Sequence, residues 1–167
     1  MSRGSILFVC TGNTCRSPMA EGILKRNLRT YGYNEYAQVL SAGTMAFLDD
    51  PAVPYAVSVS IEDGVDISSH RSRPVDAELV RNADLVLGMS PEHVEFVRSL
   101  QIGQTEATTL KEFAAKDRAP LDVYIPDPIG GSITMYRASY RELKHEIERI
   151  LPAIIERIDR KREDILE

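Results

Sequence analysis

Residues 5–18 read SILFVCTGNTCRSP, and they decide the fold. The first five residues are a short apolar run that a glycine-containing turn ends, which is typical of a buried strand. Pro18 suits the first turn of a helix, where its missing N–H costs nothing. We therefore predict a strand over Ser5–Val9, then a turn, then a helix over about Met19–Arg29 that ends before Gly32.

Strand and helix patterns alternate through the rest of the chain. Buried strands are predicted over Val39–Ser41 and Asp84–Met89, and a weaker one over Glu106–Leu110. Strands that alternate with helices imply βαβ units and a parallel sheet covered on both faces. We expect an α/β fold of three layers, formed by a single domain over residues 1–167. The intervening helices are predicted over Pro54–Glu62, over Asp76–Arg81, and after the capping pair Ser90-Pro91.

The C-terminal part contains a long loop and the clearest helix pattern. Residues 115–131 hold several prolines and a Gly-Gly pair, so we predict a long loop, a kind that is often functional. Apolar residues then recur at spacings of three and four from Ile133 to Ile158, which predicts a helix packed on the core. Pro152 should kink this helix. We interpret the cations near its end as a solvated helix terminus that complements the helix dipole. These cations are Arg157, Arg160, Lys161 and Arg162.

The composition limits the class of protein. Hydrophobic residues make up 43% and charged residues 27% of the chain, as in ordinary globular proteins. No apolar run approaches the roughly 20 residues that span a bilayer, and the N-terminus lacks a signal-peptide pattern. A formal charge of −5 argues against a nucleic-acid binder, whose surface is usually basic. We expect a cytoplasmic monomer that binds neither membranes nor nucleic acid.

The chain has only two cysteines, Cys10 and Cys15, and both lie in the quoted stretch. Their spacing cannot form a long-range disulfide framework, and with no other cysteine a structural zinc site is not expected. Cysteines placed in this way are more often reactive than structural.

The turn after the first strand has the features of a phosphate-binding loop. At the carboxyl end of a parallel strand, successive backbone N–H groups and a helix N-terminus form a concave anion site. Cys10 would face this site as a thiolate nucleophile, stabilised by the N–H groups, the helix dipole and Arg16. The Arg16 fork can hold two phosphoryl oxygens. The residues of the loop besides Cys10 and Arg16 are Thr11, Gly12, Asn13, Thr14, Cys15 and Ser17.

Three loop residues have separate expected tasks. Gly12 allows the backbone to turn sharply near the ligand. Asn13 tolerates a left-handed backbone and can bond locally to hold the loop. Ser17 can donate a hydrogen bond to the Cys10 sulfur and ease its later departure. In the long loop, Asp127 before Pro128 is a candidate general acid for the leaving group, although Asp-Pro by itself signals only a turn.

Other interpretations of the same residues remain open. One alternative is that Cys10 and Arg16 are only a buried thiol and a surface cation. A nucleotide P-loop fits poorly because no Gly-Lys-Ser/Thr follows. A non-catalytic phospho-residue reader would lack a nucleophile or an acid, and this chain has Cys10 and Asp127. A thiol redox switch, in which Cys10 and Cys15 form a disulfide under oxidant, is compatible with catalysis.

These residues resemble the low-molecular-weight protein-tyrosine phosphatase family, and the resemblance covers nearly the whole chain. It implies a four-stranded parallel sheet flanked by helices, with Cys10 as nucleophile, Arg16 as phosphate clamp and Asp127 as general acid. It also implies that Ser41 and His70 support the loop together with Asn13 and Ser17, and that neither metal nor cofactor is required. The matching segments are residues 9–21 (VCTGNTCRSPMAE), Ser41–Thr44, Asp66–Arg73, Ala83–Asp84 and Asp127–Pro128.

The resemblance divides by substrate at position 14. Tyrosine phosphatases carry a bulky aliphatic residue there, whereas the protein-arginine phosphatases carry Thr, as this chain does. A small hydroxyl suits a polar guanidinium better than an apolar ring, so we expect phosphorylated proteins with phosphoarginine as the favoured substrate and phosphotyrosine as the alternative. Ile129 stands where the arginine branch has Phe and where tyrosine-specific members have aromatic walls. A third branch, the thioredoxin-coupled arsenate reductases, needs further cysteines that this chain lacks.

Overall fold

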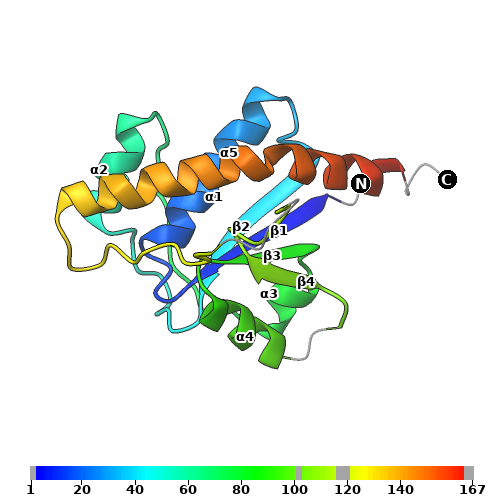
Figure 1. The fold of residues 1–167 in the computed structure, drawn as a ribbon, viewed down its shortest axis with the longest axis horizontal. Helices are drawn as coiled ribbons and strands as arrows, with labels where there is room; N and C mark the ends of the chain where they lie inside the picture. Colours follow the sequence, from blue (N-terminus) through cyan, green and yellow to red (C-terminus); the bar gives the residue numbers. More distant parts are fainter. Residues whose placement is uncertain (1–2, 101–102, 116–120, 164–167) are drawn as a thin grey trace.

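The computed structural model describes residues 3–100, 103–115 and 121–163, and its centre is a four-stranded parallel sheet in the order β2-β1-β3-β4 (Figure 1). The register pairs Cys10 with Gly43 and Val9 with Gly88, so the carboxyl ends of the three neighbouring strands meet at one edge. The predicted α/β fold and its parallel sheet are confirmed. The strands are β1 (Gly4–Cys10), β2 (Ala37–Gly43), β3 (Leu85–Gly88) and β4 (Glu106–Thr109).

Helices cover both faces of the sheet (Figure 1). Helices α1, α2 and α5 pack on one face, and α3 and α4 lie on the other. The alternation of side chains along β1 explains this arrangement, because Ile6 and Phe8 join the larger apolar cluster under α5, while Leu7 and Val9 join the smaller one. The helices are α1 (Arg16–Thr30), α2 (Pro54–Glu62), α3 (Ala77–Arg81), α4 (Pro91–Ser99) and α5 (Ile133–Glu163).

Helix α5 supplies most of one wall of the core. Its apolar stripe is buried as predicted, and each buried Leu or Ile side chain stabilises the fold by roughly 1.5–3 kcal/mol. The helix continues through Pro152, whose side chain is exposed. The buried apolar members of the stripe are Tyr136, Tyr140, Leu143, Ile147, Ile150, Leu151, Ile154 and Ile158.

Two elements, α1 and β2, have boundaries that differ from the predicted ones by more than one residue. Helix α1 begins at Arg16 rather than Met19, so it starts directly at the end of the loop. Strand β2 extends from Ala37 to Gly43, beyond the predicted Val39–Ser41, because it pairs with β1 along its whole length. Backbone hydrogen bonds to β1 keep β2 extended even where its own side chains do not form an apolar run.

The cations at the end of α5 are not a merely solvated terminus, contrary to the prediction. Lys161 forms an ion pair with Asp84 at 2.6 Å, just before β3. The Arg162 guanidinium lies 3.8 Å from the centre of the Tyr36 ring. Arg157 pairs with Glu106 of β4. The cluster therefore ties the last turns of α5 to the amino ends of the strands. Across the described segments, every helix is too short or too polar to cross a membrane.

Candidate active site

The candidate site lies at the carboxyl edge of the sheet, between β1 and α1. Cys10 is the last residue of β1 and Arg16 is the first of α1, so the loop between them spans only Thr11–Cys15. Backbone N–H groups of Thr44 and Met45, which follow β2, donate to the carbonyls of Cys10 and Thr11, each at 2.9 Å. The end of β2 thus holds the first half of the loop in place.

Gly43 makes this close approach possible. A Cβ at this position would lie 2.4 Å from the Thr11 carbonyl oxygen and 3.0 Å from the Asn13 backbone nitrogen. No side chain fits between β2 and the loop, so the glycine in the Ser-Ala-Gly-Thr segment is required by sterics. Gly12 is less constrained by the protein, because a Cβ there would meet only Thr14 Oγ1, at 3.6 Å, and its φ is not in the left-handed region. The left-handed residue of the loop is Asn13, with φ of 56°.

The Cys10 sulfur lies where the loop donates hydrogen bonds. It is 2.9 Å from Ser17 Oγ and 3.3 Å from the Asn13 backbone nitrogen, and the side chain is buried. Asn13 Nδ2 donates to Ser17 Oγ at 2.8 Å, so the Ser17 proton is free to point toward the sulfur. The loop thus directs a hydroxyl and a backbone N–H at the sulfur.

Asn13 is the centre of the hydrogen-bond network under the loop. Its second amide proton goes to Ser41 Oγ at 2.9 Å, and its Oδ1 accepts from the Arg73 N–H at 3.0 Å. His70 Nε2 lies 2.7 Å from the Asn13 carbonyl oxygen and donates to it, since a carbonyl can only accept. Burial lowers the pKa of His70, which keeps the ring neutral at pH 7. The structure therefore brings Ser41 and His70 to the loop.

Arg16 joins the loop to the distant Asp127. Its guanidinium is buried, Nη1 donates to the Ile125 carbonyl at 3.1 Å, and Nη2 donates to Asp127 Oδ2 at 3.0 Å. Asp127 Oδ1 accepts from the Ile129 N–H at 3.1 Å, which fixes the carboxylate at the end of the long loop. These contacts place the Asp127 carboxylate beside Arg16, the residue that directly follows the loop.

Thr14, Cys15 and Ile129 occupy different environments. Thr14 is half-buried and its carbonyl accepts from the Val53 N–H at 3.0 Å, whereas Ile129 is exposed. Cys15 is buried with its sulfur 3.6 Å from the Tyr136 hydroxyl. Burial raises the pKa of the Cys15 thiol, so it stays protonated at neutral pH. Both cysteines are free thiols in this structure.

Three residues of the network were missed by the sequence reasoning as site residues. Glu21 of α1 accepts a hydrogen bond from Ser41, and Arg73 Nε donates to the Ser41 carbonyl at 3.0 Å. His93 of α4 lies 2.9 Å from Thr11 Oγ1. Glu21 had a signal, because it follows Ser17 by one helical turn inside the matched segment. Arg73 also lies in a matched segment, Asp66–Arg73, but nothing local pointed to its contact with Ser41. His93 had no signal, since only the fold brings it to the loop.

A cleft of about 630 Å³ adjoins the site. Thr11, Arg16 and His93 lie on its lining near the loop, and Tyr124 and Asp127 come from the long loop. A ligand held by the loop would therefore have room to extend over the surface.

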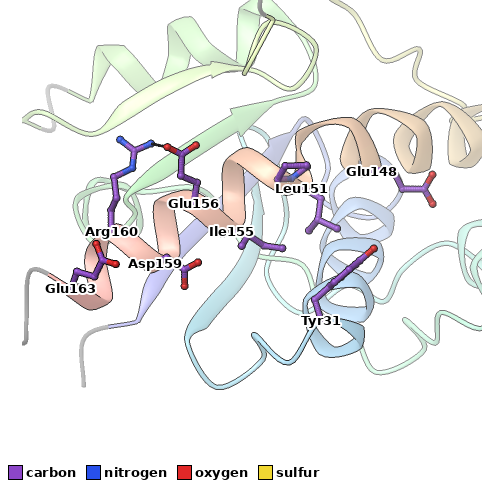
Figure 2. A pocket seen from close by; sticks show the side chains of 9 residues that line it. Tyr31, Glu148, Leu151, Ile155, Glu156, Asp159, Arg160 and Glu163 are labelled. Atoms are coloured by element: carbon purple, nitrogen blue, oxygen red, sulfur yellow. Dashed lines mark ion pairs between the residues drawn. The ribbon is translucent and has the colours of Figure 1, made fainter.

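A second cavity, of about 570 Å³, lies between Tyr31 at the end of α1 and the last turns of α5 (Figure 2). Carboxylates of Glu148, Glu156, Asp159 and Glu163 line it, and its one cation, Arg160, pairs with Glu156. A phosphate dianion would be repelled there, and the cavity contains no nucleophile. Within residues 3–100, 103–115 and 121–163, no three His, Cys, Asp or Glu side chains gather as a metal site.

Comparisons with known proteins agree with this geometry. The protein-arginine-phosphatase of Bacillus subtilis (strain 168) is 38% identical over 147 residues, which are 87% of this chain and 93% of that protein. The low molecular weight protein-tyrosine-phosphatase Wzb of Escherichia coli (strain K12) is 34% identical over 140 residues, 84% of this chain and 88% of that protein.

A solved structure gives the same result. It is a Cys-to-Ser mutant of the YwlE arginine phosphatase with a phosphorylated active-site serine, and it superposes with a TM-score of 0.80 at 36% identity over 90% of this chain and 95% of that one. The model of the low molecular weight phosphotyrosine protein phosphatase family matches residues 5–164. This chain belongs to that family and is a cysteine-dependent protein phosphatase.

Proposed function

We propose that this phosphatase removes the phosphoryl group from phosphoarginine in proteins. The observation that carries the proposal is Thr14, a small hydroxyl residue in the loop, where an aliphatic side chain would suit an aromatic ring. The Bacillus subtilis relative and the YwlE structure, both arginine phosphatases by name, support it. The enzyme works as a monomer in the cytoplasm, where thiols such as Cys10 and Cys15 stay reduced.

In the first step, the Cys10 thiolate attacks phosphorus in line with the bond to the arginine nitrogen. An S–P bond forms and the P–N bond breaks, while the protonated Asp127 donates its proton to the leaving nitrogen. Backbone N–H groups of the loop and the Arg16 fork hold the three equatorial oxygens. The 3.0 Å contact between Arg16 and Asp127 supports this arrangement, because it brings clamp and acid to one point.

In the second step, water hydrolyses the phosphocysteine. The water oxygen attacks phosphorus, and Asp127, now a carboxylate, accepts a proton from this water molecule. The S–P bond breaks as the new O–P bond forms. The Ser17 hydroxyl, 2.9 Å from the sulfur, stabilises the departing thiolate. In the YwlE mutant, a serine that replaces the active-site cysteine is phosphorylated, which supports a covalent intermediate on Cys10.

Phosphotyrosine is the second candidate substrate. The Wzb relative is a tyrosine phosphatase by name. The exposed Ile129 favours neither substrate, because it is not the aromatic residue of the tyrosine-specific members and not the Phe of the arginine branch. The mechanism would be the same, with a P–O bond in place of the P–N bond.

The deciding experiment compares kcat/KM on matched phosphoarginine and phosphotyrosine peptides for the wild type and for Thr14→Ile. We expect the wild type to prefer phosphoarginine and Thr14→Ile to shift the ratio toward phosphotyrosine by at least tenfold. Cys10→Ser serves as the control and should show no turnover of either peptide. A wild-type preference for phosphotyrosine would refute the role given to Thr14 and leave the chemistry intact.

A further inference from the structure

The Arg16 guanidinium is held from a third side by the hydroxyl of Thr11. Nη2 donates to Thr11 Oγ1 at 3.4 Å, in addition to its contacts with Ile125 and Asp127. In the proposed reaction Asp127 exchanges protons with the leaving group and with water, so its bond to Arg16 is not constant through the cycle. The Ile125 carbonyl and the Thr11 hydroxyl are the partners that can hold Arg16 throughout.

The Thr11 hydroxyl is in turn fixed by a buried histidine. Thr11 Oγ1 lies 2.9 Å from His93 Nε2, and His93 Nδ1 lies 3.0 Å from Ser90 Oγ. Arg16 has only donors, so Thr11 Oγ1 accepts from it and is free to give its own proton to Nε2. His93 then carries its proton on Nδ1 and donates to Ser90. The chain of donors runs from Arg16 through Thr11, and from Thr11 to the imidazole.

The start of helix α4 is built around this histidine. Ser90 is the N-cap residue of α4, but its hydroxyl makes no capping bond and meets the His93 ring instead. A lost cap costs a helix about 1 kcal/mol, so another interaction has taken its place. Gly88 lets the first turn of α4 pack close to β3, because a Cβ there would lie 2.9 Å from Val94 Cγ2 and 3.2 Å from the His93 Cβ. His93 itself is only 4% exposed.

We propose that His93 is a positioning residue for the phosphatase reaction, which orients the Thr11 hydroxyl and through it the Arg16 guanidinium. The proposal rests on the role of Arg16 as phosphate clamp given above. His93 touches neither the phosphoryl group nor the thiolate, and it acts only by fixing the direction from which Arg16 meets the equatorial oxygens. Its neutral state suits this task, because burial and the charge of Arg16 lower the pKa of His93 to about 4.

The test compares His93→Gln with His93→Leu. Gln places an amide oxygen near the position of Nε2 and can still accept from Thr11, whereas Leu fills similar space without an acceptor. We expect His93→Leu to lower kcat/KM by roughly five- to tenfold, the effect of one hydrogen bond, and to weaken inhibition by inorganic phosphate by a similar factor. His93→Gln should recover most of both losses. Equal impairment of the two variants would overturn the proposal.

A double-mutant cycle with Thr11→Val separates coupling from simple packing. If His93 acts through Thr11, the double variant His93→Leu with Thr11→Val is no slower than Thr11→Val alone. Losses that multiply would overturn the proposal. His145→Gln is the matched control, because this histidine is exposed on α5, and it should leave kcat/KM unchanged.

Two further variants keep the proposal testable if His93→Leu does not fold or if the role given to Arg16 is wrong. If thermal unfolding shows that His93→Leu does not fold at the assay temperature, Ser90→Ala replaces it, since that variant frees the ring while removing one oxygen. We expect a two- to fivefold loss of kcat/KM for Ser90→Ala, and an unchanged value would overturn the proposal. Arg16→Ala tests the underlying function separately. If it is active, the clamp itself is wrong; if it is inactive and His93→Leu is normal, only the role of His93 fails.

Discussion

Asn13 shows how one residue can set the geometry of the loop. Its left-handed backbone turns the chain, and its backbone N–H points at the Cys10 sulfur. Its side-chain amide donates one hydrogen bond to Ser17 and one to Ser41. Few side chains combine a tolerated positive φ with two donors and an acceptor. Its φ of 56° and its full burial follow from these two demands together.

At the same scale, Asp127→Asn tests the proposed acid. The amide cannot donate and then accept a proton, but it keeps the size of the side chain. We expect kcat on a phosphoarginine peptide to fall about 10²–10⁴-fold, with KM changed much less. Rapid-mixing kinetics should still show phosphocysteine formation if the P–N bond breaks more easily than the S–P bond hydrolyses. A kcat within threefold of the wild type would remove Asp127 from the mechanism.

The sequence predicted those site residues that are close together in the chain. Cys10 and Arg16 sit in one loop between a recognisable strand and helix, so local patterns suffice. Asp127 lies 111 positions from Arg16, and its Asp-Pro pair signals only a turn, so its proposed role needed the resemblance. His93 carries no periodic or turn signal that points to Thr11, because their contact depends on how α4 follows β3. The start of α1 was missed because Arg16 and Ser17 are polar, and the loop buries them.

At the scale of elements, Gly43→Ala tests how tightly β2 holds the loop. The new Cβ would lie 2.4 Å from the Thr11 carbonyl oxygen and 2.8 Å from the Ala46 Cβ, so the backbone must shift. We expect the free energy of unfolding to fall by about 1–3 kcal/mol, as in other overpacked sites, and kcat/KM to fall with it. Urea unfolding and peptide kinetics measure both. Gly12→Ala is the steric control, since its Cβ would meet nothing closer than 3.6 Å, and it should unfold at nearly the wild-type urea concentration.

Asp63 joins three helices at the end of α2. It accepts from Arg26 of α1 at 2.7 Å and from Tyr140 and Lys144 of α5 at 2.9 and 2.8 Å. Burial alone would raise the pKa of Asp63, but the hydrogen bonds from Lys144, Arg26 and Tyr140 lower it to about 2. A carboxylate with a lowered pKa stabilises the fold above its unfolded pKa and loses this contribution as the pH falls toward 2.

We therefore expect Asp63→Asn to lower the free energy of unfolding at pH 7 by about 1–2 kcal/mol, after allowance for its partial exposure. Activity on peptides should be unchanged, because the residue lies away from the loop. Urea unfolding at pH 7 measures the loss, and Glu148→Gln, a change at an exposed carboxylate of α5, serves as the control. An equal effect of the two substitutions would mean that the joint between the helices contributes nothing specific.

At the scale of the whole molecule, the parallel sheet explains why one edge carries all of the chemistry. The parallel strands end there, so the loops after β1, β2 and β3 and residues 121–131 before α5 converge at this edge (Figure 1). The cations of α5 lie at the opposite, amino end of the strands. Near this edge, burial of His93 disfavours its protonated form, so the free energy of unfolding depends on pH. The ionisable groups that face His93 are Arg16, Glu92 and Asp127.

The last prediction concerns how this stability depends on pH. The pKa of His93 is about 4 in the folded protein, so between its ordinary value of 6.5 and 4 the unfolded chain binds the proton more tightly. Stability is therefore lost as the pH falls through this window, and His93 contributes no further change below it. The full difference corresponds to roughly 3 kcal/mol. Urea unfolding between pH 7.5 and 4.5 should show a loss larger by about 2–3 kcal/mol in the wild type than in His93→Gln, which does not titrate. His145→Gln should follow the wild type, and parallel curves for the wild type and His93→Gln would show that the buried ring titrates normally.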